Sequence, residues 1–77
     1  MKELLTRIVK AMVDAPDEVN ITETDGDHAV MLNLKVAKYD IGKVIGKKGR
    51  NVQAVRIILS AVAAKNQKRV IIELQED

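Results

Sequence analysis

A turn signal between two alternating segments is the feature that most constrains the fold of this 77-residue chain. Asp25-Gly26 predicts a tight hairpin, because glycine adopts positive φ without steric cost. Apolar and polar residues alternate before the turn, around Val19 and Ile21, and after it over residues 29–37. The returning strand carries Val30, Leu32, Leu34 and Val36 on one face, and Ala29, Met31, Asn33, Lys35 and Ala37 on the other. A hairpin with one apolar face must be covered by other elements.

Helical periodicity elsewhere in the chain supplies that cover. Apolar residues from Leu4 to Val13 recur at the spacing of one helical face, and Pro16 ends this helix. Asp40 is expected to be the N-cap of a short helix, and a longer helix is predicted over residues 50–64. A last strand is predicted over residues 69–74. The order α-β-β-α-α-β predicts an α+β fold, with a three-stranded mixed sheet and three helices packed on one face.

Composition narrows the possible functions. A hydrophobic fraction of 47% is enough for the core of one small domain, and the absence of cysteine excludes disulfides and thiolate metal sites. Between Lys35 and Arg56 the chain has seven basic residues and one acidic residue, whereas the remainder has six basic and ten acidic. A locally basic surface favours a polyanionic partner, and a solvated lysine-rich face gives the same pattern.

Membrane and export signals are missing from the sequence. No apolar run approaches the roughly 20 residues that span a bilayer. The N-terminal segment is amphipathic rather than continuously apolar, unlike a signal peptide. We therefore expect a cytoplasmic protein with no membrane association.

Candidate catalytic and metal-binding residues are isolated from one another. His28 is the only histidine and lies beside the turn, where Asp25 and Asp27 are more simply turn formers. Ser60 is the only serine and has no histidine near it in the sequence. We therefore expect no enzymatic activity, no metal and no cofactor. Tyr39 is the only aromatic residue, which disfavours the RNA-binding folds that stack bases on aromatic side chains.

Residues 45–50, IGKKGR, place two lysines between Gly46 and Gly49, just before the long helix. Glycine permits a sharp reversal there and removes the Cβ atoms that would keep a ligand at a distance. Free N–H groups at the helix N-terminus, together with Lys47 and Lys48, suit a phosphate. The segment is not a nucleotide-binding loop, because Gly42 and Gly46 are separated by three residues rather than four, and no Ser or Thr follows the lysine. A dinucleotide-binding fingerprint is also excluded, since residue 44 is valine where glycine is required.

The stretch VIGKKGRNV resembles the GxxG signature of the KH domain, whose loop clamps the backbone of about four single-stranded nucleotides. The order α-β-β-α-α-β is similar to that of the type II KH fold, in which the central strand has one antiparallel and one parallel neighbour. The resemblance covers nearly the whole chain, as a single KH domain over residues 1–77. At this length the chain resembles the small bacterial KH proteins of the KhpA family. That resemblance implies cytoplasmic binding of single-stranded RNA, as an RNA chaperone or post-transcriptional regulator. It also implies a homodimer, or a heterodimer with a larger KH protein of the Jag (EloR) type.

The predicted RNA site combines the loop, its basic neighbours and the apolar wall of the short helix before it. Its residues are Ile41, Lys43, Val44, Ile45, Gly46, Lys47, Lys48, Gly49 and Arg50. The loop is expected to hold phosphates, with Lys43 and Arg50 as auxiliary contacts, while bases lie over the apolar wall. The sequence does not divide the apolar residues of that wall between core and groove.

The long helix has more apolar surface than one packing face requires. One stripe at helical spacing consists of Val52, Val55, Leu59, Val62 and Ala63, and a second consists of Ala54, Ile57, Ile58, Ala61 and Ala64. The second stripe has two explanations: deep burial between the sheet and the first helix, or a partner interface in which small residues allow close approach. A protein-interaction adaptor acting mainly through this helix is therefore the alternative to RNA binding.

Overall fold

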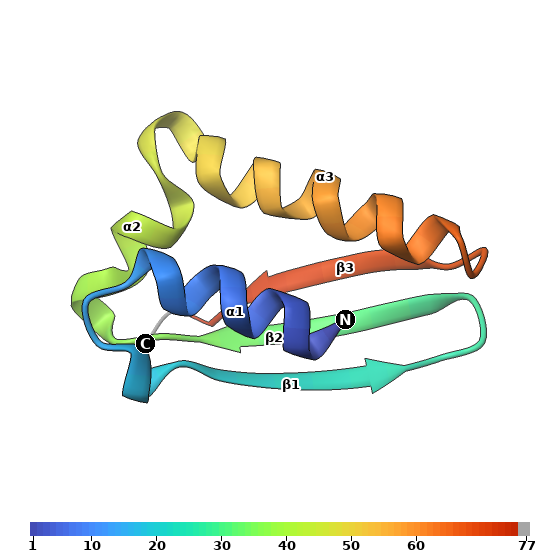
Figure 1. The fold of residues 1–77 in the computed structure, drawn as a ribbon, viewed down its shortest axis with the longest axis horizontal. Coiled ribbons are helices and arrows are strands. Elements are labelled where there is room, and N and C mark those ends of the chain that lie inside the picture. Colours follow the sequence, from blue (N-terminus) through green and yellow to red (C-terminus); the bar gives the residue numbers. More distant parts are fainter. Residues whose placement is uncertain (76–77) are drawn as a thin grey trace.

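The predicted hairpin forms one half of a three-stranded sheet in the computed structural model, which describes residues 1–75 (Figure 1). Strands β1 (Asn20–Asp25) and β2 (Ala29–Lys35) are antiparallel, and the Gly26 N–H donates to the Ala29 carbonyl at 2.9 Å. Strand β3 (Arg69–Leu74) runs parallel to β2 on its other side. The mixed sheet expected of the type II KH fold is thereby confirmed. Residues 76 and 77, the end of the predicted domain, lie outside the described residues.

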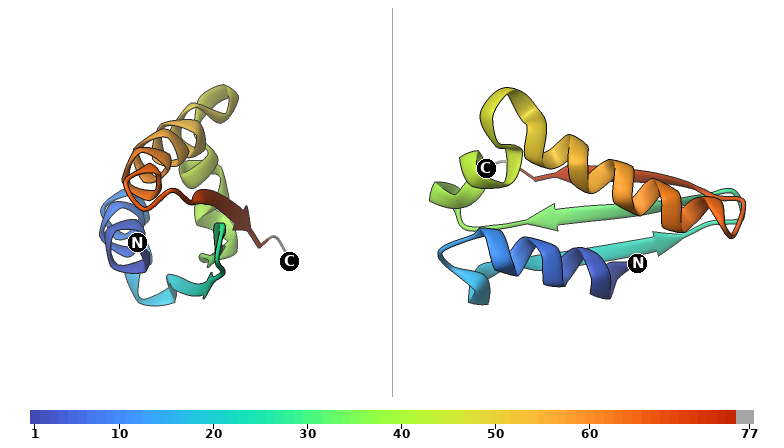
Figure 2. Two further views of the ribbon diagram at one scale, coloured as in Figure 1. Left: turned by 90° about the vertical axis from the view of Figure 1, so that its right-hand side faces the viewer. Right: turned by 45° about the horizontal axis from the view of Figure 1, so that its top comes forward.

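Three helices cover one face of this sheet, as the chain's apolar patterns predict (Figures 1 and 2). They are α1 (Lys2–Met12), α2 (Ile41–Ile45) and α3 (Arg50–Ala64). Single 3-10 turns at Pro16–Glu18, Lys38–Asp40 and Lys47–Gly49 join these elements. The bounds predicted for the long helix and the last strand agree with α3 and β3. Within residues 1–75 no helix is long and apolar enough to cross a membrane.

The core lies between the sheet and helices α1 and α3. The predicted inner face of β2 is confirmed, because Val30, Leu32, Leu34 and Val36 are all buried. Facing them are Leu5 and Val9 of α1, and Val55, Leu59 and Ala63 of α3. Ala37 departs from the prediction: it is buried rather than on the outer face, because β2 ends at Lys35 and the alternation stops there.

Asp40 occupies the N-cap position of α2, as predicted, but its side chain makes no capping hydrogen bond to that helix. Its φ and ψ of −96° and −7° are helical, whereas an N-cap side chain reaches the first turn from an extended conformation. The side chain is instead 0% exposed, and its two carboxylate oxygens accept the backbone N–H groups of Asp14 and Ala15, each at 3.0 Å. A buried carboxylate therefore ties the chain that leaves α1 to the start of α2.

Replacing Asp40 with alanine should lower the free energy of unfolding by about 3 kcal/mol, because two partly buried N–H donors lose a charged acceptor. Asp40→Asn should cost less, since its amide oxygen still accepts one of the two N–H groups. Chemical denaturation measures both losses. Asp17→Ala is the matched control at an exposed aspartate, and its stability should change by no more than about 0.5 kcal/mol. Equal stability of wild type and Asp40→Ala would contradict the role given to this carboxylate.

Candidate nucleic-acid interface

The loop between α2 and α3 projects from the upper corner of the molecule in Figure 1, where the chain turns through an unusual backbone conformation. Gly46 and Gly49 have φ of +76° and +74°, in the left-handed region that favours glycine. Lys48 between them also has positive φ, at 58°. Left-handed conformations are costly for a residue with a Cβ, and such strain gathers at functional sites.

Asn51 fixes this loop from the first turn of α3. Its side-chain Nδ2 donates to the carbonyl oxygen of Lys43 at 2.9 Å and so joins the two helices across the loop. A Cβ on Gly46 would lie 2.5 Å from Asn51 Cγ, so this close packing requires glycine at residue 46. Sequence reasoning missed Asn51. The available signal was that asparagine favours bonds to nearby backbone groups over a place within a helix.

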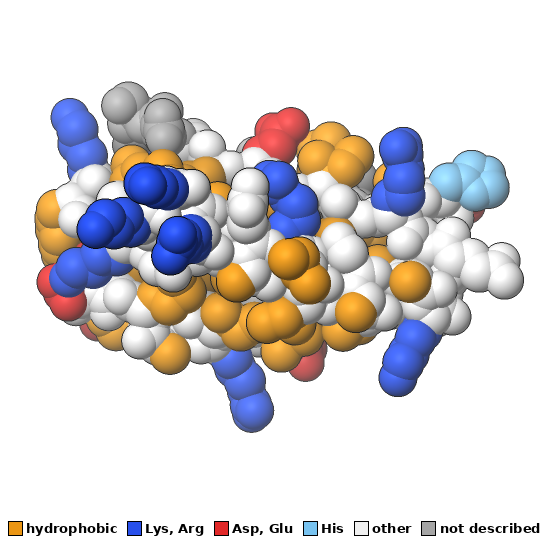
Figure 3. Space-filling view, turned by 90° about the horizontal axis from the view of Figure 1, so that it is seen from above, with side chains coloured by type: hydrophobic (Ala, Val, Ile, Leu, Met, Phe, Trp, Pro, Cys, Tyr) orange, Lys and Arg blue, Asp and Glu red, His pale blue; other side chains and the backbone are white. Residues whose placement is uncertain are grey.

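The positive charge predicted for the loop faces solvent. Lys47, Lys48 and Arg50 are exposed, and within residues 1–75 none of them forms an ion pair. Figure 3 shows basic side chains gathered at the end of the molecule where the loop lies. The first turn of α3 has no acidic residue and no side-chain cap, so the positive end of the helix dipole is not neutralised locally. The arrangement favours an anion.

Lys43, predicted to be an auxiliary phosphate contact, is held differently from the loop lysines. Its Nζ donates to the carboxylate of Asp14, on the segment that leaves α1. This hydrogen bond, helped by the charges of Asp14 and Asp40, holds the pKa of Lys43 above its ordinary value. Lys43 therefore has a carboxylate partner of its own in this structure.

The apolar wall divides between core and surface. Val44 of α2 is 2% exposed and packs in the core, so it anchors this short helix to the rest of the domain. Ile41 and Ile45 are half-buried and leave apolar surface accessible beside the loop. The two accessible isoleucines are the part of the predicted wall that can meet a base.

The second apolar stripe of α3 is exposed, so the explanation by deep burial is wrong. Ile57 and Ile58 are 70% and 47% exposed, while Ala54, Ala61 and Ala64 are exposed beside them. Of the first stripe, Val55, Leu59 and Ala63 are buried, Val52 is half-buried and Val62 is exposed. Apolar side chains accordingly lie along the surface seen from above in Figure 3.

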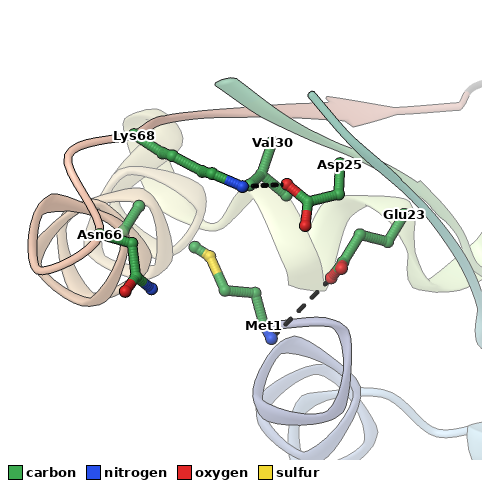
Figure 4. A pocket seen from close by; sticks show the side chains of 7 residues that line it. Met1, Glu23, Asp25, Val30, Asn66 and Lys68 are labelled. Atoms are coloured by element: carbon green, nitrogen blue, oxygen red, sulfur yellow. Dashed lines mark hydrogen bonds and ion pairs between the residues drawn. The ribbon is translucent and has the colours of Figure 1, made fainter. Parts of the chain in front are cut away.

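A cavity of about 150 Å³ lies away from the loop, where α1 begins and α3 ends (Figure 4). Its charged groups pair with one another: Lys68 Nζ lies 2.5 Å from an Asp25 carboxylate oxygen, and the Met1 amino nitrogen lies 3.8 Å from that of Glu23. With its cations already paired to these two carboxylates, the cavity has no complementarity to a phosphate chain.

The three glycines of this region should respond differently to alanine. Gly46→Ala should destabilise most, because it combines about 1–3 kcal/mol of positive-φ backbone strain with the clash against Asn51. Gly49→Ala should show the backbone strain alone, since its Cβ meets no atom within 4 Å. Gly42→Ala, in helix α2 and equally open, should be stabilising by about 0.5–1 kcal/mol. Denaturation midpoints of the three variants test this order, and a Gly46→Ala protein as stable as Gly42→Ala would contradict it.

Comparison with known proteins agrees with the KH-type fold. The family model described as "KhpA/KhpB, KH domain" matches residues 2–74. The protein named RNA-binding protein KhpA from Clostridium acetobutylicum is 50% identical over 74 residues, which cover 96% of this chain and 99% of the relative. The proteins of the same name from Chlamydia pneumoniae and Listeria monocytogenes are 49% and 43% identical. These matches cover 100% and 99% of this chain, and 99% and 100% of the two relatives. This protein therefore belongs to the KhpA/KhpB family of KH domains.

Proposed function

We propose that this protein binds single-stranded RNA through the Gly46–Gly49 loop. The observation that carries the proposal is the exposed cationic turn at the uncapped start of α3, in a chain whose relatives are named RNA-binding proteins. Glycines at both ends of the turn let a sugar-phosphate backbone approach closely. Lys47, Lys48 and Arg50 then supply the opposite charge.

The bases lie over Ile41 and Ile45, next to the loop. These side chains offer apolar contact and no hydrogen-bonding pattern, so we expect little base preference. Few phosphates are contacted, so binding is weak and salt-dependent, with a slope of about −0.7 per neutralised phosphate in a plot of log affinity against log salt. Weak, unselective and reversible binding fits an RNA chaperone or a post-transcriptional regulator in the cytoplasm. Binding of this kind requires no catalytic residue.

Reversing the loop charge tests this proposal. The double variant Lys47→Asp/Lys48→Asp should bind a labelled single-stranded RNA at least about tenfold more weakly by fluorescence anisotropy, because two attractions to phosphate become repulsions. Its stability should change by no more than about 0.5 kcal/mol, since both side chains are exposed and aspartate tolerates positive φ better than lysine.

The matched control is Lys2→Asp/Lys10→Asp, which makes the same change of net charge on exposed lysines of α1. It should retain most of the RNA affinity. Full affinity in the loop variant, or an equal loss in both variants, would overturn the loop as the binding site.

A second function is supported by the exposed stripe of α3. Two isoleucines flanked by alanines form an apolar surface on which another helix can pack closely. We propose that this stripe is a protein interface, either in a homodimer or with a larger KH protein of the Jag (EloR) type. The family description, which joins KhpA with KhpB, agrees with pairing between KH proteins.

Ile57→Asp should convert a dimer to a monomer, because it places a charge at the most exposed isoleucine of the stripe. Light scattering gives the mass, and circular dichroism checks that the variant is folded. Ile71→Asp is the control, since this isoleucine is exposed on the opposite face of the sheet. A folded Ile57→Asp dimer would exclude the stripe as the homodimer interface.

A further inference from the structure

Lys43 lies where two features of the structure meet. It belongs to α2, three residues before Gly46, and its carbonyl oxygen accepts the Asn51 side chain that braces the loop. Its Nζ meanwhile donates to the carboxylate of Asp14, which lies two residues after the end of α1. The backbone of Lys43 thus helps to hold the loop, while its side-chain charge is paired with Asp14.

Asp14 is held in place as a partner for Lys43. The Asp14 N–H is bound by the buried Asp40 carboxylate at 3.0 Å, and the Ala15 N–H is bound by the other oxygen. Because Asp40 fixes this backbone, the carboxylate of Asp14 stays within reach of Lys43 on α2. A negative charge is therefore kept close to the proposed phosphate site.

The ion pair is nevertheless accessible to solvent. The side chains of Lys43 and Asp14 are 45% and 66% exposed, so water and salt screen their attraction. Exposed pairs of this kind are weak, in contrast to the buried contacts of Asp40. A phosphate arriving at the loop can displace a carboxylate held so weakly.

From this geometry we infer that Asp14 competes with RNA phosphate for Lys43 and thereby sets the affinity of the loop. In the free protein, Asp14 pairs with Lys43, the basic residue of α2. On binding, the ammonium of Lys43 exchanges the Asp14 carboxylate for a phosphate oxygen. The inference rests on the proposed RNA-binding function and assigns to Asp14 a role that weakens it.

Removing the Asp14 charge should strengthen RNA binding. Asp14→Asn has nearly the same shape and keeps the backbone N–H that Asp40 binds, but its amide attracts Lys43 far less than a carboxylate does. The affinity for a fluorescein-labelled single-stranded RNA of about twelve nucleotides should rise about two- to fivefold at low salt. The gain should shrink as salt is added, since salt screens the exposed pair in the wild type. Asp14→Ser, which also removes the charge, must give the same direction of change.

A double-mutant cycle separates competition for Lys43 from general repulsion of RNA by Asp14. In a Lys43→Gln background, Asp14→Asn should leave the affinity unchanged, because the contested cation is gone. Asp17→Asn removes an exposed charge three residues away and should have little effect. An equal gain in the Lys43→Gln background, or no gain in the wild-type background, would overturn the inference.

The same titrations distinguish failure of the inference from failure of the proposed function. Suppose that the wild type binds RNA, that Lys47→Asp/Lys48→Asp loses this affinity, and that Asp14→Asn does not increase it. This result refutes only the competition by Asp14. A wild-type protein with no RNA affinity refutes both. Unfolding midpoints of all variants are measured alongside, and the gain must appear in variants as stable as the wild type.

Discussion

The buried carboxylate of Asp40 is the interaction on which the rest of the site depends. A charge removed from water must be matched by hydrogen bonds, and here the backbone N–H groups of Asp14 and Ala15 provide them. These donors lie in the segment that follows α1, whereas Asp40 immediately precedes α2. One side chain therefore fixes the direction of α2 relative to the first helix, and α2 in turn positions the loop.

The loop is built to hold its shape before any ligand arrives. Positive φ at both glycines sets the reversal, and Asn51 joins the first turn of α3 to the last turn of α2. Ordering a loop on binding consumes part of the interaction free energy, so a braced loop retains more of it. The free energy saved by a preformed loop matters because the proposed site has few cations and an accessible apolar wall of only two isoleucines.

The sequence predicted the features that arise from local patterns and missed those that arise from contacts between distant segments. Alternation identified the buried face of β2, and helical spacing gave the bounds of α3. The role of the Asp40 side chain was missed, because an aspartate before a helix looks the same whether its carboxylate caps that helix or binds backbone 25 residues away. The Lys43–Asp14 pair spans 29 residues, so no local pattern indicates it. The second stripe of α3 was left undecided because burial depends on where the sheet and α1 end.

The two proposed functions meet on one helix, and each makes the other more useful. The first turn of α3 adjoins the proposed phosphate-binding loop, while the exposed stripe is the surface proposed for a second KH domain. Under these proposals, a single loop with an acidic competitor beside it binds RNA weakly and releases it readily. Joining two such domains places two loops on one particle, so the second contact becomes intramolecular and apparent affinity rises without a stronger site. The two proposals together therefore predict that RNA binding depends on assembly, because an isolated domain lacks the second contact that would retain the strand.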